Sequence, residues 1–275
     1  MNLLHAFFLG IIQGLTEFIP VSSTAHLLIV QKILGLPAND TMFSFLVLVQ
    51  IGTIISLFIY FWKELVSILV DTLKNLGGLR EFKSLPGNAK LGWYILIATI
   101  PALLVGYLLK DAIEALFRLP LLEAAIRLFA AAILLSLAER LTKKNRQLES
   151  MNWLDALVVG LFQIIAVFPG ASRSGSTISG GMFRGLDRPS AARFAFLMSV
   201  PVMLAAGAYE MLDVIRMPGL AEFLPALVVG FITAAIVGWL AVRWLLQYLA
   251  KHSLYVFSAY CALVGIIVLI FYFAG

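Results

Sequence analysis

Long apolar runs are the feature of this sequence that most restricts its fold. The stretches Phe45–Trp62 and Leu254–Ala274 approach the roughly 20 residues that a helix needs to cross a bilayer. Only 13% of the 275 residues are charged, whereas soluble domains contain about 25%. The sequence therefore predicts an all-α polytopic membrane protein, with residues 1–275 forming one integral membrane domain. The net charge of +5 does not indicate nucleic acid binding, because cytoplasmic loops of membrane proteins collect Lys and Arg.

Two polar stretches interrupt this apolar background. The first is QGLTEFIPVSSTAH, from Gln13 to His26, and the second is QIIAVFPGASRSGST, from Gln163 to Thr177. In each stretch a proline separates two short predicted helices. Such a hairpin of half-length helices is typical of a re-entrant segment, whose broken backbone must be surrounded by protein or water. We expect the two hairpins to meet inside the membrane and to form one site.

The order of the predicted elements indicates an inverted-topology repeat. Repeat 1 covers about residues 1–142 and repeat 2 about residues 152–275, and each consists of a hairpin and three spans. Three is an odd number, so the second repeat must enter from the opposite side of the membrane. The first half is predicted to contain the hairpin 2–17 and 23–35, the spans 41–62, 89–109 and 120–141, an amphipathic helix and loop over 63–88, and a surface helix over 110–118. The second half is predicted to contain the hairpin 152–168 and 174–184 and the spans 188–213, 222–245 and 252–273.

The distribution of basic residues predicts the orientation in the membrane. Placing the loops 63–90, 140–149, 184–193 and 243–251 on one side collects fourteen Lys and Arg there, against four on the other side. Cytoplasmic loops are enriched in these residues, so both termini are expected to face outward. The first hairpin then enters from the outside and the second from the cytoplasm.

The first polar stretch combines a carboxylate with hydroxyl groups and an imidazole. Gln13 and Glu17 are four residues apart and share one helix face. A carboxylate at membrane depth is costly and indicates a functional site, although a structural hydrogen bond is the alternative. The next half-helix begins with three hydroxyl side chains, where free N–H groups favour an anion: Ser22, Ser23 and Thr24. His26 lies one turn beyond Ser23, which suits an acid or base, the alternative being a core histidine.

The second polar stretch is centred on Arg173, at a predicted helix start. Arginine presents a rigid fork of donors that matches phosphate. Gly170 and Gly175 would let backbone N–H groups approach an anion closely. Ser172, Ser174 and Thr177 add further hydroxyl groups. The alternative is a glycine-rich turn with an arginine that extends toward the membrane surface.

These residues resemble the bacterial undecaprenyl-diphosphate phosphatases of the bacitracin-resistance type. The resemblance rests on Gln13-x-x-x-Glu17 followed by PVSSTAH, and on PGASRSGST from Pro169 to Thr177, and it covers essentially the whole chain. It implies hydrolysis of a polyprenyl diphosphate to the monophosphate, which recycles the lipid carrier of cell-wall synthesis in the bacterial inner membrane and confers resistance to bacitracin. It also implies a site that opens to the outer face and a divalent cation, Mg²⁺ or Ca²⁺, at Glu17. Gln13 stands where relatives often have a second carboxylate, which weakens the case for a dicarboxylate metal site.

The residues together suggest a phosphoryl-transfer mechanism. We expect Ser23 to attack the terminal phosphorus and His26 to take or relay its proton. Arg173 and the hydroxyl groups of the second hairpin would bind the phosphate oxygens. Glu17, with Gln13, would hold the metal or orient a water molecule or His26. Direct attack by His26 or by water is compatible with the same residues.

A transporter or flippase is the competing function class. Inverted repeats with broken helices are the usual plan of secondary carriers, and an anion carrier would also use Arg173. Such a carrier would have less use for a serine and a histidine one turn apart. The sequence is compatible with a homodimer but does not predict one.

Overall fold

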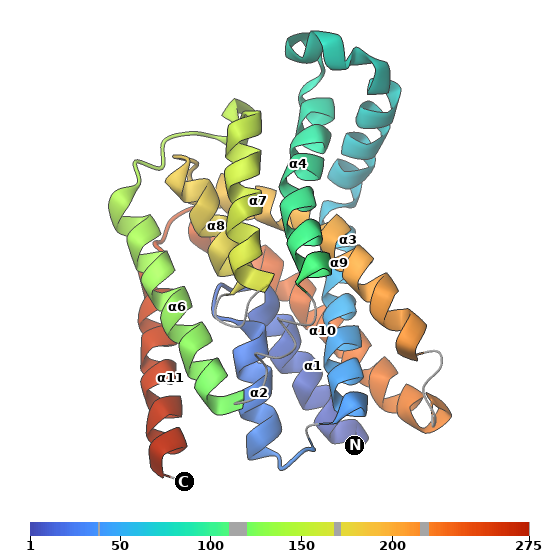
Figure 1. Ribbon diagram of the computed structural model, residues 1–275, viewed down its shortest axis with the longest axis vertical. Coiled ribbons are helices and arrows are strands. Elements are labelled where there is room, and N and C mark those ends of the chain that lie inside the picture. The colour runs from blue at the N-terminus through green and yellow to red at the C-terminus, as the bar shows by residue number, and fades with distance from the viewer. Residues whose placement is uncertain (38, 110–119, 168–171, 215–219, 275) are drawn as a thin grey trace.

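The part of the chain that the structure describes consists of helices and connecting loops and contains no β-strand. The structure is a computed structural model, and it describes residues 1–37, 39–109, 120–167, 172–214 and 220–274 (Figure 1). The first half contains the helices α1 (Leu3–Phe18), α2 (Ser23–Ile33), α3 (Asp40–Lys74), α4 (Gly87–Leu108) and α6 (Pro120–Leu141) and the 3₁₀ segment Leu76–Ser84. The second half contains the 3₁₀ turn Leu148–Ser150 and the helices α7 (Trp153–Val167), α8 (Arg173–Phe183), α9 (Arg188–Val214), α10 (Leu220–Leu249) and α11 (Tyr255–Ala274). The predicted fold class is confirmed, while the surface helix predicted over 110–118 lies outside the described residues.

Both predicted hairpins of short helices are present. α1 and α2 have 16 and 11 residues, and α7 and α8 have 15 and 11. At 1.5 Å per residue the longest of them measures roughly 24 Å, less than the hydrocarbon core of about 30 Å. In Figure 1 the α1–α2 hairpin enters the bundle from the lower end and the α7–α8 hairpin from the upper end. The hairpins therefore approach each other inside the bundle, while an inverted symmetry that relates the two halves stays a prediction.

Five described helices are long and apolar enough to span a membrane. They are Thr41–Lys74, Gly87–Leu108, Leu121–Leu141, Ala221–Leu249 and Tyr255–Ala274. The sequence predicts six spans, and α9 occupies the place of the sixth, although it is not among these five. The multi-span character is thus confirmed.

The boundary predicted after the first span lies next to a kink in α3. The sequence predicts that this span ends at residue 62 and that a separate amphipathic helix follows, and α3 consists of two helical segments that meet at Phe61 and extend to Lys74. Its only non-helical backbone lies at Phe61, with φ −104° and ψ 16°. No proline or glycine occurs between residues 63 and 74, so nothing in the sequence ends the helix there. The amphipathic segment is an extension of the span, joined to it at a kink.

Close helix packing places α1 deep in the bundle. α1 packs on α10, and a Cβ atom at Gly10 would lie 2.6 Å from the carbonyl oxygen of Gly230. A Cβ atom at Gly14 would lie 2.9 Å from the Ala234 carbonyl oxygen. Small residues at such crossings allow two membrane helices to approach closely. The last turn of α1, with Glu17, is therefore held in the interior.

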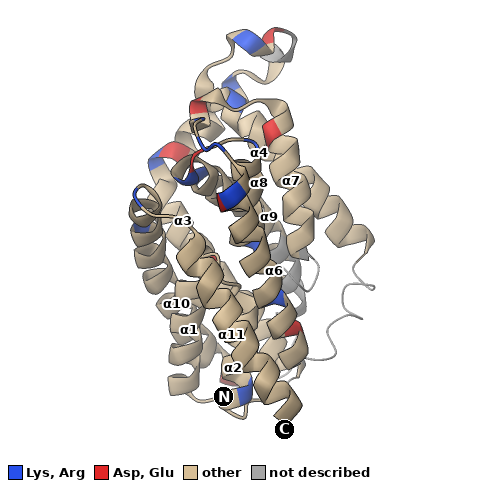
Figure 2. Ribbon diagram, turned by 90° about the vertical axis from the view of Figure 1, so that its left-hand side faces the viewer, with Lys and Arg blue, Asp and Glu red and all other residues tan. Residues whose placement is uncertain are grey.

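Charged residues gather at one end of the molecule. Figure 2 shows most Lys and Arg of the described chain at the end where α7, α8 and the loops before them lie. Both termini lie at the opposite end (Figure 1). This separation is the one that the loop count predicts, although Lys110, Arg118 and Arg216 lie outside the described residues.

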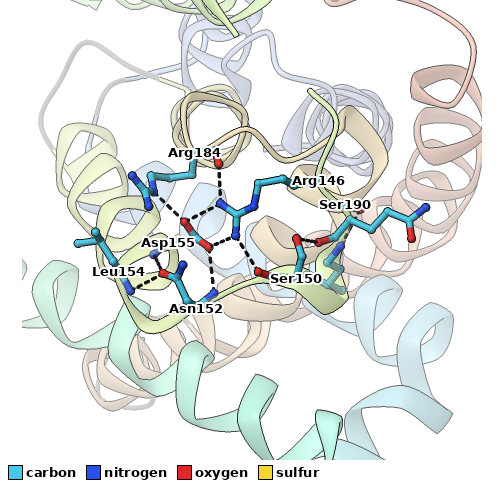
Figure 3. A network of polar contacts seen from close by, with 9 residues as sticks. Arg146, Ser150, Asn152, Leu154, Asp155, Arg184 and Ser190 are labelled. Atoms are coloured by element: carbon cyan, nitrogen blue, oxygen red, sulfur yellow. Dashed lines mark hydrogen bonds and ion pairs between the residues drawn. The ribbon is translucent and has the colours of Figure 1, made fainter. Parts of the chain in front are cut away.

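A network around Asp155 fixes the second hairpin to the loop that precedes it (Figure 3). The Asp155 carboxylate is fully buried and accepts hydrogen bonds from Arg146, at 2.7 and 3.1 Å, and from Arg184, at 2.7 Å. The backbone N–H of Asn152 donates to the same carboxylate at 2.9 Å. Burial alone would raise the pKa of Asp155, but the hydrogen bonds from Arg146, Asn152 and Arg184 outweigh it and lower the pKa below its ordinary value. The start of α7 and the end of α8 are thereby tied together.

We expect Asp155→Asn to destabilise the protein by about 2–3 kcal/mol, because two arginines at a mostly buried site would lose their counter-ion. The melting temperature in detergent should fall by about 5 °C. Because the folded-state pKa lies below that of the unfolded chain, this stabilisation is present above about pH 4 and is lost as the pH falls through the lowered pKa. The variant should therefore differ from wild type at pH 7 and much less near pH 3. Glu149→Gln, which removes an exposed carboxylate from the same loop, is the control, and an equal effect of both changes would contradict the role of Asp155.

Candidate active site

Glu17 is the centre of the hydrogen bonds that join the two hairpins. The residue is 6% exposed and lies at the end of α1. Its Oε2 accepts a hydrogen bond from Gln13 Nε2 at 2.8 Å and another from Ser23 Oγ at 2.7 Å. Its Oε1 accepts a hydrogen bond from Gln50 Nε2 at 3.3 Å and forms an ion pair with Arg173 Nη2. Residues about 150 positions apart thus meet at one carboxylate, as the sequence predicts.

The backbone between α1 and α2 turns sharply at this point. Pro20 follows the end of α1, and the Val21 N–H donates to the Ile19 carbonyl at 2.7 Å. Ser22, which precedes the first residue of α2, has φ +69°, a left-handed conformation that is costly for a residue other than glycine. The turn directs the first residue of α2, Ser23, back toward Glu17. A strained turn of this kind is typical of a functional site.

The second hairpin presents Arg173 at the first position of α8. The Ser172 side chain caps this helix by accepting a hydrogen bond from the Gly175 N–H at 3.2 Å. The Ser174 hydroxyl reaches the Ile19 carbonyl of the first hairpin at 3.4 Å. A Cβ atom at Gly175 would lie 3.7 Å from Pro20 Cβ, so the two turns are in van der Waals range. This contact places the Arg173 guanidinium beside Glu17.

A polar pocket of about 210 Å³ lies between the hairpins and the surrounding spans. Its volume corresponds to roughly seven water molecules at about 30 Å³ each. It is lined by Glu17, Ser22, Ser23, Thr24, Gln50, Ala102, Arg127, Gln163, Ala166, Ser172, Arg173 and Val202. Two guanidinium groups, three hydroxyl side chains of α2 and its cap, and one carboxylate therefore face the same space. The pocket suits an anionic ligand with several oxygen atoms.

The structure directs His26 away from Ser23. The His26 Nδ1 is 2.9 Å from the Ser22 carbonyl oxygen, and Nε2 is 2.8 Å from the Tyr260 hydroxyl of α11. The two rings are nearly parallel, with centroids 5.7 Å apart. Both ring nitrogens are therefore engaged elsewhere, and the Ser23 hydroxyl donates its hydrogen bond to Glu17 Oε2 instead. His26 holds the Ser22 turn and α11 together in this geometry.

The remaining predicted phosphate-binding residues divide into three groups. Ser22, Thr24 and Ser172 line the pocket. Ser174, Gly175 and Thr177 are buried beside it, and the Thr177 hydroxyl donates to the Arg173 carbonyl at 2.8 Å. Gly170 lies outside the described residues. Ser22, Thr24 and Ser172 therefore face the pocket, whereas the Thr177 hydroxyl supports the first turn of α8.

Three polar pocket residues, Gln50, Arg127 and Gln163, are absent from the predicted site. The sequence predicts that Arg127 pairs with Glu123, four residues earlier on one helix, and not that it binds a ligand, although a cation inside an apolar helix is by itself a signal of function. Gln163 ends the segment GLFQ, which matches GIIQ before Glu17, and this match was the available signal. Gln163 is 1% exposed, and neither amide atom has a hydrogen-bond partner among the described residues. A buried polar group without a partner costs about 1–3 kcal/mol, so this amide is expected to serve a ligand.

The side chains of the pocket are too few to bind a metal ion alone, but they could bind one together with the phosphate oxygens of a substrate. Among the described residues no group of three His, Cys, Asp or Glu side chains could hold a metal ion. Glu17 contributes one carboxylate, beside the side-chain amides of Gln13 and Gln50. Mg²⁺ is commonly bound by one or two carboxylates together with substrate phosphates and water. These residues thus fit an ion that is shared with a phosphorylated substrate.

Known proteins match this chain over nearly its whole length. Residues 6–267 match the sequence model of the family described as bacitracin resistance protein BacA. The chain is 42% identical to an undecaprenyl-diphosphatase of Chlorobium phaeovibrioides (strain DSM 265 / 1930), with 100% of this chain and 99% of the relative covered. It is also 42% identical to an undecaprenyl-diphosphatase of Mycobacterium leprae (strain Br4923), over 95% of this chain and 92% of the relative. A third relative, from Syntrophobacter fumaroxidans (strain DSM 10017 / MPOB), has the same printed activity and is 37% identical over 96% of this chain and 95% of its own.

Proposed function

Because the chain belongs to the bacitracin resistance protein BacA family, we propose that the pocket around Glu17 is the place where it hydrolyses undecaprenyl diphosphate. The products are undecaprenyl monophosphate and inorganic phosphate, so the enzyme recycles the lipid carrier of cell-wall synthesis and supports resistance to bacitracin. The observation that supports this placement is the convergence of Ser23 and Arg173 on Glu17 from two separate hairpins.

In the proposed first step the Ser23 Oγ attacks the terminal phosphorus of the diphosphate. The bond between Oγ and phosphorus forms as the bond from phosphorus to the bridging oxygen breaks, which releases undecaprenyl monophosphate. Glu17 Oε2, 2.7 Å from Oγ, takes the hydroxyl proton and passes it to the leaving group. The engagement of both His26 ring nitrogens by other groups favours Glu17 over His26 as the base.

Arg173 binds the phosphoryl group during transfer. Its guanidinium lies beside Glu17 and lines the pocket, and a planar fork can contact two phosphate oxygens at once. The charge that develops on the transferred phosphoryl group in the transition state would thus be offset by a fixed cation. The ion pair with Glu17 holds Arg173 in place before the substrate arrives.

In the second step water attacks the phosphorus of the phosphorylated Ser23. The bond from phosphorus to Oγ breaks, inorganic phosphate leaves, and a proton from the water returns through Glu17 to the serine oxygen. The same carboxylate therefore acts as base and acid in alternate steps.

A divalent cation, Mg²⁺ or Ca²⁺, is proposed to accompany the substrate. Glu17, with Gln13 and Gln50 beside it, would hold the ion together with the phosphate oxygens. When bound, the ion would neutralise part of the diphosphate charge.

The site is proposed to open to the outer face of the bacterial plasma membrane, with both termini outside. The positions of the two termini at the end with few basic residues support this orientation. The prenyl chain would lie between apolar spans, so the substrate would reach the pocket sideways from the bilayer. The relatives with a diphosphatase activity do not favour the transporter that the sequence also allows.

The experiment that tests this proposal measures phosphate release from undecaprenyl diphosphate by the purified protein in detergent. An enzyme acts there without two compartments, whereas a transporter needs two compartments to show activity. We expect wild type to release phosphate, and we expect a chelator to slow release more than about tenfold until Mg²⁺ is added back. Release that is insensitive to the chelator would remove the cation from the proposal, and an inactive wild type would remove the hydrolase.

A further inference from the structure

Gln163 is a buried amide on the wall of the pocket. It lies on α7, one helical turn before the end of that helix, and its side chain lines the pocket that contains Ser23 and Arg173. The side chain is 99% buried, yet neither its amide nitrogen nor its amide oxygen has a hydrogen-bond partner in the described chain. Buried amides in proteins are nearly always hydrogen-bonded, so this exception points to a group that enters the pocket.

Arg127 lies on the wall of the same pocket. It belongs to α6, which does not supply any residue of the proposed reaction, and it is 4% exposed. Glu123 is one turn earlier on the same helix face and is also buried, so it serves as a counter-ion within the membrane. A guanidinium has five N–H donors in a fixed fork, more than one carboxylate accepts, which leaves Arg127 able to serve a second anion.

The reacting phosphate does not need both arginines. Ser23 and Arg173 are already joined through Glu17, which places them together on one part of the pocket wall. Arg127 and Gln163 come from α6 and α7, and neither contributes to this set of hydrogen bonds around Glu17. A diphosphate has two phosphate groups, and the pocket has two guanidinium groups from different elements.

We propose that Arg127 and Gln163 form a second phosphate subsite, which binds the phosphate that stays on the lipid. This inference rests on the proposed function, since it assigns the second phosphate of the same substrate. Arg127 contacts its non-bridging oxygens, and the Gln163 amide N–H donates to it or to the bridging oxygen. Negative charge accumulates on this phosphate as the bond from the bridging oxygen to the terminal phosphorus breaks, so the subsite stabilises the leaving group.

The subsite gives the enzyme a way to distinguish a diphosphate from a monophosphate. A diphosphate fills both positions, whereas the monophosphate product fills only one. The loss of the second set of contacts favours release of the product and prevents its further hydrolysis.

The test compares Arg127→Gln and Gln163→Met with wild type. The measured quantities are the KM for undecaprenyl diphosphate and the inhibition constants of two probes, methylenediphosphonate and orthophosphate. We expect each variant to weaken methylenediphosphonate inhibition about 10- to 100-fold, because charge-assisted hydrogen bonds to one of its two phosphorus groups are lost. Orthophosphate inhibition should change less than about twofold, since Arg173 still binds a single phosphate.

Gln163→Met adds a readout that a purely structural glutamine would not give. Methionine fills a similar volume and removes the buried amide that has no partner in the described chain. The melting temperature of the variant protein should therefore rise, while its affinity for the diphosphate probe falls. Arg140→Gln, which removes an exposed arginine from the same helix, is the control and should match wild type. If Arg127→Gln fails to fold, Gln163→Met alone still tests the subsite.

The outcomes separate this inference from the proposed function. An active wild type with an unchanged ratio of the two inhibition constants in Gln163→Met overturns the subsite alone. An equal loss of affinity for both probes also overturns it, because it would mean a general effect on the pocket. A wild type that releases no phosphate would instead overturn the proposed function.

Discussion

Replacing Ser23 with alanine should reduce phosphate release from undecaprenyl diphosphate by about 10³-fold or more. The Ser23 hydroxyl is hydrogen-bonded to Glu17 at 2.7 Å and lines the pocket, and alanine removes both the nucleophile and the proton donor. The side chain is small and partly exposed to the pocket, so the protein should fold normally. Since substrate binding depends on other residues, we expect kcat to fall much more than KM rises.

The measurement should include a chemical test for the intermediate. Wild-type protein that is quenched in acid during turnover should carry phosphate on Ser23, detectable by mass spectrometry of the peptide. Ser84→Ala, in the 3₁₀ segment outside the bundle, removes a hydroxyl group far from the site and should behave as wild type. Near-normal turnover of Ser23→Ala would exclude serine as the nucleophile and leave attack by water or by His26.

The sequence predicts the membrane fold and the central site residues because charge and hydrogen-bonding groups are costly in hydrocarbon. In an apolar chain, Glu17 and Arg173 are conspicuous, and the prolines beside them show where helices break. The contact between the hairpins follows from the need of each buried charge for a partner. These inferences use only local sequence and the properties of the bilayer.

Features that depend on tertiary packing could not be predicted from the local sequence. A spacing of three residues suggests that His26 faces Ser23, but Tyr260 of α11 draws the ring to another side. The sequence around His26 does not predict a hydrogen bond with a tyrosine more than 200 positions away. Arg127 was missed for a similar reason, since the sequence does not show which side of a spanning helix faces the pocket. The length of α3 depends on the absence of a helix breaker, which is a weaker signal than the presence of one.

The ion pair between Glu17 and Arg173 has a consequence for the order of events. Before substrate arrives, the two charges satisfy each other in a buried setting. A diphosphate that contacts Arg173 weakens this pair and leaves Glu17 with Gln13, Gln50 and Ser23 as donors. Glu17 Oε2 keeps the hydrogen bond from the Ser23 hydroxyl and is placed to accept its proton. Substrate binding would in this way prepare the nucleophile.

Arg173→Lys should lower kcat/KM about 10²-fold, and Arg173→Ala about 10³-fold or more. Lysine keeps a positive charge near Glu17, but a point charge cannot make two parallel hydrogen bonds to a phosphoryl group. The alanine variant also leaves Glu17 buried without its cation, so it should be less stable by about 3 kcal/mol, whereas the lysine variant should unfold close to the wild-type temperature.

The comparison of these two variants separates binding geometry from charge. Steady-state kinetics in detergent, together with melting temperatures, should place Arg173→Lys near wild type in stability and far below it in activity. Arg140→Lys makes the same exchange at an exposed site on α6 and should leave both quantities unchanged. If Arg173→Lys keeps wild-type kinetics, a single positive charge is sufficient and the bidentate contact with the transferred phosphoryl group is wrong. A parallel loss of stability and activity would instead assign Arg173 to holding the two hairpins together.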